Sequence, residues 1–155
     1  MSESLVIIQG TKEEQYKNLL PQIKGLLYGE TDTIANMANI ASALNMQFRW
    51  WWVGFYIVRK DELVLGPFQG TIACTRIRKG RGVCGTAWQV NKTLIVEDVN
   101  HFAGHIACSA ESKSEIVVPI IKNNEVIAVL DADSEHYAHF DETDKKYLEK
   151  IVALL

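Results

Sequence analysis

The chain has 155 residues, 48% of them apolar, and its 16 basic and 19 acidic residues leave a formal net charge of −3. This length suits one sizeable core, so a single domain over residues 1–155 is predicted. The charge provides no positive field for phosphates, which argues against nucleic acid as a partner. No apolar stretch approaches the roughly 20 residues of a membrane span. The start lacks the pattern of a secretory leader, so we expect a cytoplasmic protein.

Two helices are predicted before residue 50. The first begins with a capping box at Thr11–Glu14 and continues through apolar residues at helical spacing, with Pro21 as a kink or break. Gly29 separates it from a second helix, which Thr31 and Asp32 cap.

From residue 49 onward, aromatic and β-branched residues indicate strands. Three strands are predicted as a meander, over 49–58, 62–65 and 68–75. Glycines then mark a turn into a short helical segment at 87–89, and a brief strand follows at 94–96. Residues 97–114 form a long connection, and such a loop in a compact domain is more often functional than idle.

Two further strands, 115–121 and 125–132, are predicted to form a tight hairpin at Asn123-Asn124, because asparagine tolerates positive φ. A last helix begins with Asp141 as its N-cap. Helices at both ends of a run of strands predict an α+β fold, in which N- and C-terminal helices flank an antiparallel central sheet.

The three cysteines, Cys74, Cys84 and Cys108, are separated by ten and twenty-four residues. A structural disulfide framework uses an even number of cysteines. In a reducing compartment, disulfides are usually transient and catalytic. The cysteines therefore point to redox or nucleophilic chemistry.

A zinc site is the main alternative for this region. His101, His105 and Cys108 fall at i, i+4 and i+7, which on a helix would place three ligands on one face. The fourth ligand would come from elsewhere in the chain: Cys74, Cys84 or Asp98. Asn100 and Gly104 argue against a long helix here. Histidines in a loop are more often solvated, so no metal is expected.

Acidic residues cluster on the predicted hairpin. Asp131 and Asp133 follow an apolar run, and residues i and i+2 of a strand point to the same side. Neighbouring carboxylates disfavour simultaneous ionisation, so one pKa rises and that group becomes a proton donor near neutral pH. Counting outward from the turn pairs Glu115 with Asp131 or Ala132. Solvated acidic residues at strand ends are an equally good interpretation of this pattern.

An aromatic run, Trp50-Trp51-Trp52, leads to Tyr56. Alternation along a strand places Trp50, Trp52 and Tyr56 on one face and Trp51 on the other. The first face offers an N–H and an O–H at the wall of an apolar slot, whereas core packing of both faces is the plainer interpretation.

Several segments match one known family: Gly80–Ala87, Val96–Val99, Cys108, Glu115–Pro119 and Val129–Ser134. Together they resemble the free methionine-(R)-sulfoxide reductases, which are built on a GAF domain, and the resemblance extends over essentially the whole chain. The Val-Pro and Leu-Asp-x-x-Ser elements are typical of GAF domains in general. The specific features are the cysteine triplet, the acidic residues and the Trp-Trp-Val-Gly-Phe-Tyr run.

The resemblance implies a reaction through cysteine. Cys108 is the implied nucleophile, which attacks the sulfoxide sulfur and becomes a sulfenic acid as methionine leaves. Cys74 then condenses with it to a disulfide, with Cys84 as the alternative partner. The implied external reductant is thioredoxin, no cofactor is bound, and the activity counters oxidative stress.

The resemblance also implies how substrate is held. Carboxyl groups protonate the sulfoxide oxygen and bind the substrate ammonium, with three candidates: Glu115, Asp131 and Asp133. Backbone N–H groups receive the substrate carboxylate, at Ile106, Ala107 and Cys108. Trp52 and Tyr56 hold the methyl-sulfoxide end. A site that needs both charged ends of an amino acid excludes methionine sulfoxide within a polypeptide.

The family commonly forms homodimers, which the resemblance extends to this chain. The alternative function is a non-catalytic GAF domain that binds a small ligand and signals. The two functions differ in their need for thiols. A sensor should survive replacement of all three cysteines, whereas the reductase should lose turnover in Cys108→Ser.

Overall fold

A six-stranded sheet forms the centre of the molecule, in the order β3-β2-β1-β6-β5-β4 with every neighbouring pair antiparallel. The computed structural model describes residues 4–106 and 108–155. Its strands are β1 (Trp52–Arg59), β2 (Glu62–Gly70), β3 (Arg76–Arg78), β4 (Leu94–Val96), β5 (Ser114–Lys122) and β6 (Glu125–Ser134). Its α-helices are α1 (Lys12–Leu27), α2 (Thr33–Phe48), α3 (Gly82–Val90) and α4 (Glu142–Val152).

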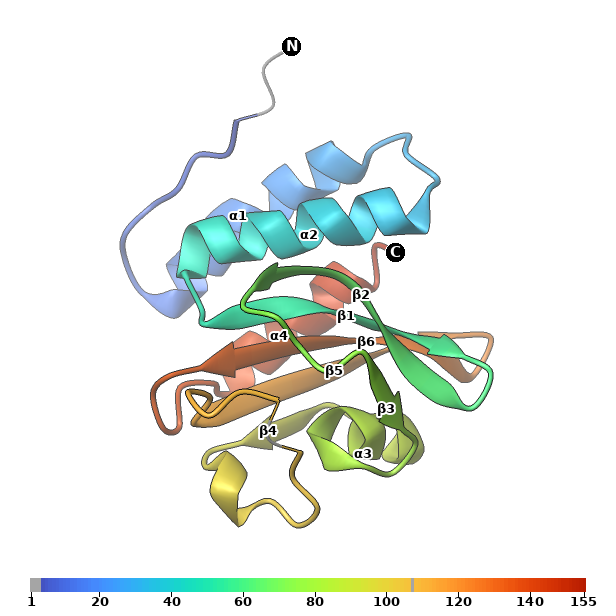
Figure 1. Ribbon diagram of the computed structural model, residues 1–155. Helices are drawn as coiled ribbons and strands as arrows, with labels where there is room; N and C mark the ends of the chain where they lie inside the picture. Colours follow the sequence, from blue (N-terminus) through green and yellow to red (C-terminus); the bar gives the residue numbers. More distant parts are fainter. Residues whose placement is uncertain (1–3, 107) are drawn as a thin grey trace.

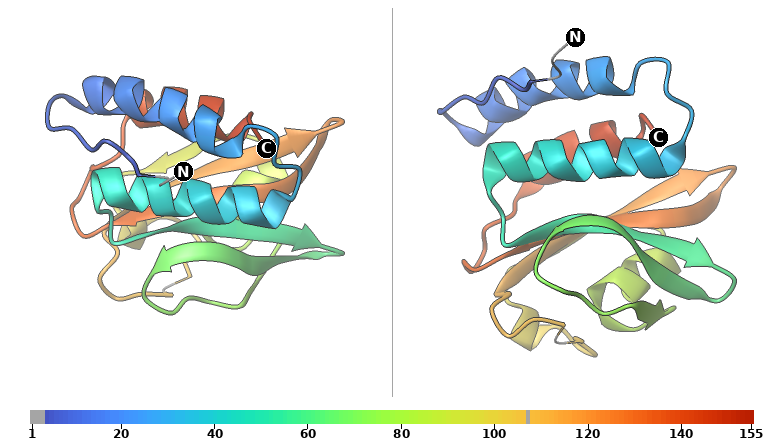
Figure 2. Two further views of the ribbon diagram at one scale, coloured as in Figure 1. Left: turned by 90° about the horizontal axis from the view of Figure 1, so that it is seen from above. Right: turned by 45° about the horizontal axis from the view of Figure 1, so that its top comes forward.

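The helices lie on both faces of the sheet, as Figures 1 and 2 show. Helices α2 and α4 pack on one face with α1 packed against them, and the larger core on this side contains Val53, Phe55 and Leu130. Helix α3 covers the other face, where a smaller core contains Tyr56, Val117 and Val129. The alternation of strand side chains between the two cores confirms the α+β prediction. No helix in the described part of the chain is long and apolar enough to cross a membrane.

The predicted helix termini are present. Thr11 and Glu14 form the capping box of α1, Asp32 caps α2 and Asp141 caps α4. Helix α1 is not broken at Pro21. Its buried face, which includes Leu19 and Ile23 on either side of the proline, packs on the core and offsets the lost backbone hydrogen bond.

The β5–β6 hairpin turns at Asn123 and Asn124, whose φ angles of 51° and 64° confirm the predicted turn. The register shifts between Ile120 and Ile121, where the ladder is irregular. As a result Glu115 pairs with Asp133, one residue beyond Ala132, so the prediction that it lies near Asp131 or Ala132 is corrected by one residue.

The prediction of separate strands over 62–65 and 68–75 is wrong. Strand β2 is one strand from Glu62 to Gly70, although its pairing with β1 shifts register between the Gly54–Phe68 and Tyr56–Leu65 pairs, and residues 71–75 form a loop before β3. Pro67 is tolerated inside β2 because β3 pairs only with Glu62–Val64, which leaves the proline on an open edge.

The expected alternation of the tryptophan run also fails at its start. Strand β1 begins at Trp52, so the period of two does not extend back to Trp50 and Trp51. Trp50 packs in the core beneath α1, α2 and α4, whereas Trp51 packs on the α3 side together with Trp52 and Tyr56.

Candidate active site

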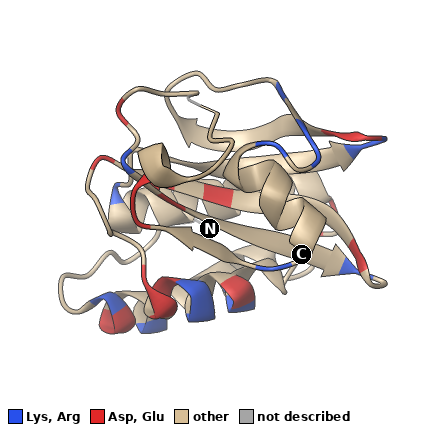
Figure 3. Cartoon of the chain, turned by 90° about the horizontal axis from the view of Figure 1, so that it is seen from below, with Lys and Arg blue, Asp and Glu red and all other residues tan. Residues whose placement is uncertain are grey.

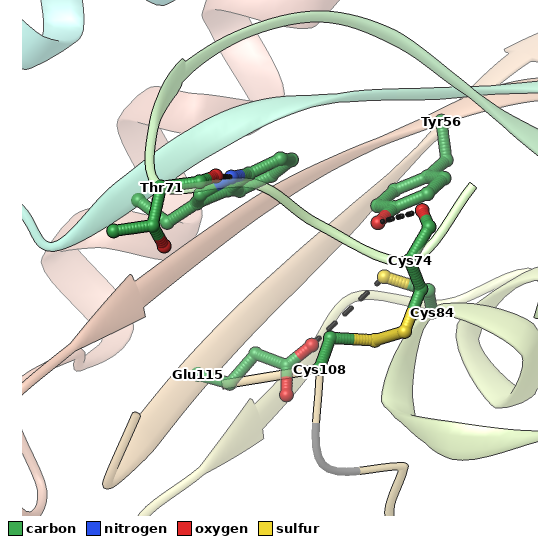
Figure 4. The surroundings of a disulfide bond; sticks show 7 residues. Tyr56, Thr71, Cys74, Cys84, Cys108 and Glu115 are labelled. Atoms are coloured by element: carbon green, nitrogen blue, oxygen red, sulfur yellow. Dashed lines mark hydrogen bonds between the residues drawn. A yellow bond between two sulfur atoms is a disulfide. The ribbon is translucent and has the colours of Figure 1, made fainter. Parts of the chain in front are cut away.

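A disulfide joins Cys74 to Cys108, with their Cα atoms 5.5 Å apart. Cys74 is half-buried in the loop between β2 and β3, and Cys108 is exposed in the long connection between β4 and β5. Cys84 is buried in α3 and takes part in no disulfide. Figure 4 shows the Cys84 sulfur on the sheet side of the disulfide, directed toward Glu115. The fold therefore brings all three cysteines into one region.

A pocket lies between the disulfide and the α3 face of the sheet. Figure 3 looks onto this side of the molecule. The predicted site residues that line the pocket are Trp52, Tyr56, Cys84, Ile106, Cys108, Glu115, Asp131 and Asp133. Cys74 reaches it through its bond to Cys108. Ala107, a predicted carboxylate-binding position, lies outside the described residues.

Three carboxyl groups form the floor of the pocket. Glu115 on β5 lies across from Asp133 on β6, and Asp131 is two residues along the same face. Glu115 and Asp131 are buried. Burial raises the pKa of all three carboxyls, that of Asp131 to about 6, and the charge of Asp131 raises the pKa of the other two further. The cluster therefore retains protons near neutral pH.

Hydrogen bonds separate the roles that these carboxyls can play. Ser112 donates to Asp133 Oδ1 at 2.5 Å, which lowers the pKa of Asp133 against the effect of burial. The Cys84 thiol donates to Glu115 Oε1 at 3.9 Å. Asp131 Oδ1 is buried without a hydrogen-bond partner among the described residues. A buried, unpaired acceptor is costly, so this oxygen is available to a ligand.

The Cys84 thiol is held in its protonated form. Burial raises its pKa well above the ordinary value, and the nearby charges of Asp131, Glu115 and Asp133 raise it further. Because the thiolate is the nucleophilic form, Cys84 is poorly suited to attack a sulfur atom in this setting.

Trp52 and Tyr56 hold the loop that carries Cys74. Trp52 Nε1 donates to the carbonyl of Thr71 at 3.0 Å, and the Tyr56 hydroxyl donates to the carbonyl of Cys74 at 2.8 Å (Figure 4). The two rings are stacked, with centroids 5.9 Å apart. Their polar groups were expected to be free for an occupant of the slot, but they are used by the loop backbone.

The loop predicted to bind the substrate carboxylate has one of its three backbone N–H groups in a hydrogen bond. The backbone N–H of Cys108 donates to the carbonyl of Ile106 at 3.0 Å, so it is occupied in this disulfide form. The Ile106 side chain packs against Gly82, where a Cβ would lie 3.3 Å from Ile106 Cγ1. Glycine at this position therefore lets the loop approach the start of α3.

Sequence reasoning missed several residues that line the pocket, and Ser112 and Trp51 are two of them. Ser112 belongs to the long connection and carries no motif that indicates its bond to Asp133. Trp51 lines the pocket and donates from Nε1 to Ser109 Oγ at 3.2 Å. The start of the strand at Trp52 would have placed Trp51 correctly, but the aromatic run itself does not mark that start.

The zinc site considered for the long connection is not assembled. Among the described residues of this connection, Val99–His101 alone is helical, as a single 3₁₀ turn, so the spacing of the two histidines does not place them on one helix face. His101 lies beside Asp98 with 85% of its side chain exposed. The Cys108 sulfur is bonded to Cys74.

Comparison with known proteins places this architecture in a family. A GAF-domain model matches residues 31–155. The free methionine-R-sulfoxide reductase of Escherichia coli is 47% identical over 145 residues, which cover 93% of this chain and 88% of that protein. The Saccharomyces cerevisiae protein of the same name is 44% identical over 153 residues, covering 93% of this chain and 85% of its own length.

A solved structure extends the likeness to three dimensions. The free methionine-R-sulfoxide reductase of Neisseria meningitidis, whose X-ray structure contains its substrate, is 51% identical and superposes with a TM-score of 0.96. The match covers 99% of this chain and 93% of that one. The chain therefore belongs to the GAF-domain family, in the group of the free methionine-R-sulfoxide reductases.

Proposed function

We propose that this chain reduces free L-methionine-(R)-sulfoxide to methionine through Cys108. The observation that carries the proposal is that the Cys74–Cys108 disulfide and three carboxyl groups meet at one pocket, with Glu115 and Asp131 buried and Asp133 half-buried. A sulfoxide reductase needs a thiol pair that can be oxidised and an acid beside it, and both line one pocket here. Relatives at 44% to 51% identity bear the name of this activity, and the R preference is taken from them.

The first step transfers two electrons from Cys108 to the substrate. The Cys108 thiolate attacks the sulfoxide sulfur and forms a sulfur–sulfur bond while a protonated carboxyl donates to the oxygen; the sulfur–oxygen and sulfur–sulfur bonds then break, and the oxygen passes to Cys108 as a hydroxyl. Methionine leaves with its sulfur reduced, and Cys108 is left oxidised as a sulfenic acid. Glu115 and Asp133, whose pKa values burial raises well above normal, are the candidate donors.

The second step forms the disulfide. The Cys74 thiolate attacks the sulfenic sulfur of Cys108, water leaves, and the two sulfurs become bonded. Cys74 suits this role better than Cys84 because Cys84 is buried and its pKa is raised by burial and by neighbouring carboxyls. A dithiol of the thioredoxin type then reduces the disulfide by exchange at the exposed Cys108 side.

The third carboxyl group, that of Asp131, can explain why the substrate is a free amino acid. Asp131 has the smallest rise in pKa of the cluster and an oxygen without a partner, so it is the group best suited to accept the substrate ammonium. A methionine sulfoxide within a polypeptide has no such ammonium. It would leave the Asp131 charge buried and unpaired, which disfavours its binding.

The test is consumption of NADPH by thioredoxin reductase and thioredoxin, with free R-sulfoxide, free S-sulfoxide and a peptide-bound sulfoxide as separate substrates. Turnover should be confined to the free R isomer and be lost in Cys108→Ser. Cys74→Ser should release one methionine per chain and then stop as a sulfenic acid. Folded, reduced protein that reduces none of the three substrates would point instead to a ligand-binding GAF sensor.

A homodimer is part of the same proposal, since it too comes from the resemblance. Light scattering of the purified chain measures the mass directly. The expected mass is twice the 17.5 kDa of one chain, and a monomer that retains full turnover would separate oligomeric state from activity.

A further inference from the structure

Three potential metal ligands converge at the floor of the pocket from three different elements. Cys84 lies on α3, Glu115 on β5 and Asp131 on β6. One donor atom from each, a sulfur and two carboxylate oxygens, lies within 4.8 Å of the others, and all three residues are buried. In Figure 4 the Cys84 sulfur points toward the Glu115 carboxylate, next to the disulfide. This set differs from the histidine motif of the long connection.

A second observation indicates that a ligand belongs here. Asp131 Oδ1 has no hydrogen-bond partner among the residues described, although Asp131 is only 6% exposed. Asp131 also lines the pocket, so a ligand entering the pocket can reach it. Buried charged oxygens are ordinarily paired or coordinate a cation.

We propose that Cys84, Glu115 and Asp131 bind a thiophilic divalent cation, with Zn²⁺ as the best match, and that the bound cation closes the pocket to other ligands. Around tetrahedral zinc, with bonds of about 2.0 to 2.3 Å, ligand atoms lie about 3.3 to 3.8 Å apart. The Cys84 sulfur and Glu115 Oε1 are already 3.9 Å apart. Small side-chain rotations complete the site, and water from the pocket takes the fourth position.

The donor set decides which cation is favoured. A thiolate ligand selects Zn²⁺ and Cd²⁺ over Mg²⁺ and Ca²⁺, which prefer oxygen donors alone. Binding releases the Cys84 thiol proton and the proton that the Glu115–Asp131 pair holds, both to solvent, and the metal–sulfur bond replaces the sulfur–hydrogen bond. No electron is transferred, so the site exists in both redox states of the other two cysteines.

The oxidised protein isolates this site for experiment. With Cys74 and Cys108 joined, Cys84 is the remaining thiol of the three in the chain, so a metal–thiolate signal can come only from Cys84. Tag-free oxidised protein is titrated with Cd²⁺ while the ultraviolet charge-transfer absorption of the cadmium–thiolate bond is recorded. Zn²⁺ is titrated in parallel by calorimetry.

We expect one cation to bind per chain and a cadmium–thiolate band that disappears in Cys84→Ser. The affinity for zinc should fall by about tenfold or more in both Cys84→Ser and Asp131→Asn. Asp98→Asn, which alters an acidic residue of the long connection outside the proposed ligand set, should bind like the parent. Near-ultraviolet circular dichroism establishes that each variant is folded. Absence of the band, or zinc affinity equal in the parent and both ligand variants, would overturn the site.

Discussion

Glu115 lies directly opposite Asp133 across the β5–β6 ladder, on the same face of the sheet as Asp131. The register shift between Ile120 and Ile121 produces this pairing, because it adds one residue to β6 between the turn and the site. The paired carboxyls cannot both ionise cheaply at such proximity and depth. Strand pairing thus brings together the carboxyl groups that stay protonated and that the proposed chemistry uses as proton donors.

Glu115→Gln should make the protein more stable at neutral pH and nearly inactive. Because the folded pKa of Glu115 is raised, the stability this residue contributes is full below its unfolded pKa of about 4.3 and is lost as pH rises through the folded value. Glutamine does not ionise, so the variant does not lose this stability as pH rises. The variant should match the parent near pH 4 and exceed it by about 1 to 3 kcal/mol near pH 8.

Urea denaturation across this pH range, with a chelator present, measures the difference. Glu125→Gln is the matched control, because Glu125 lies on β6 but is exposed. Its stability should follow that of the parent at every pH. A Glu115→Gln protein that loses stability as pH rises, in parallel with the parent, would show that the Glu115 pKa is not raised.

Ser112→Ala should shift the pH dependence of sulfoxide reduction. The hydroxyl of Ser112 stabilises the ionised form of Asp133, so its removal raises the pKa of Asp133. If the protonated cluster donates to the substrate, the alkaline limb of kcat/KM moves to higher pH. Loss of this hydrogen bond to a half-buried acceptor also costs about 1 kcal/mol of stability.

The matched control is Ser109→Ala, which removes a hydroxyl of the same connection that contacts Trp51 instead of Asp133. Its alkaline limb should stay where it is in the parent. A limb that moves to lower pH in Ser112→Ala, or that moves equally in both variants, would contradict the assignment.

Local patterns predicted much of the fold. The capping residues Thr11 and Asp141 and the turn at Asn123-Asn124 each act within a few residues, so their chemistry is visible in the sequence. The period of two correctly placed Asp131 and Asp133 on one face of a strand. These features depend on no distant part of the chain.

The errors come from features that depend on a partner strand. The register of Glu115 depends on an irregularity in the hairpin that neither strand reveals alone. The continuity of β2 depends on its pairing with β1, which resumes on both sides of a register shift at Gly66–Pro67. Ser112 reaches Asp133 only after the long connection folds back over the sheet. Tertiary contacts of this kind have no signature in a single sequence.

Gly54→Ala should severely destabilise the protein. Gly54 lies opposite Asp131 in one ladder and Phe68 in the other, and a Cβ there would overlap the Cβ of Phe68 and the ring of Trp52. Overpacking a central strand in this way costs about 3 kcal/mol. Gly25→Ala is the control, because its added Cβ meets nothing within 4 Å and alanine favours the helix by about 0.5 to 1 kcal/mol.

The midpoint of urea denaturation distinguishes the two glycine variants. It should fall for Gly54→Ala and rise slightly for Gly25→Ala, with similar slopes. Equal midpoints would mean that β1 and β2 separate enough to admit a methyl group. In that case the close packing of Trp52 on Phe68 would not set the wall of the pocket.

Tyr56→Phe should slow formation of the disulfide without removing the nucleophile. The Tyr56 hydroxyl fixes the carbonyl of Cys74 at 2.8 Å, and loss of one such hydrogen bond is worth about 1 kcal/mol. If that bond positions Cys74 for attack, the rate of the second step falls about fivefold. The Cys108 sulfenic acid then persists longer, and trapping with a cyclic 1,3-dione after rapid mixing with sulfoxide measures its lifetime.

Tyr28→Phe, at a residue that is 91% exposed, should leave that lifetime unchanged. A shorter lifetime in Tyr56→Phe would mean that the hydrogen bond restrains Cys74 away from Cys108 rather than toward it.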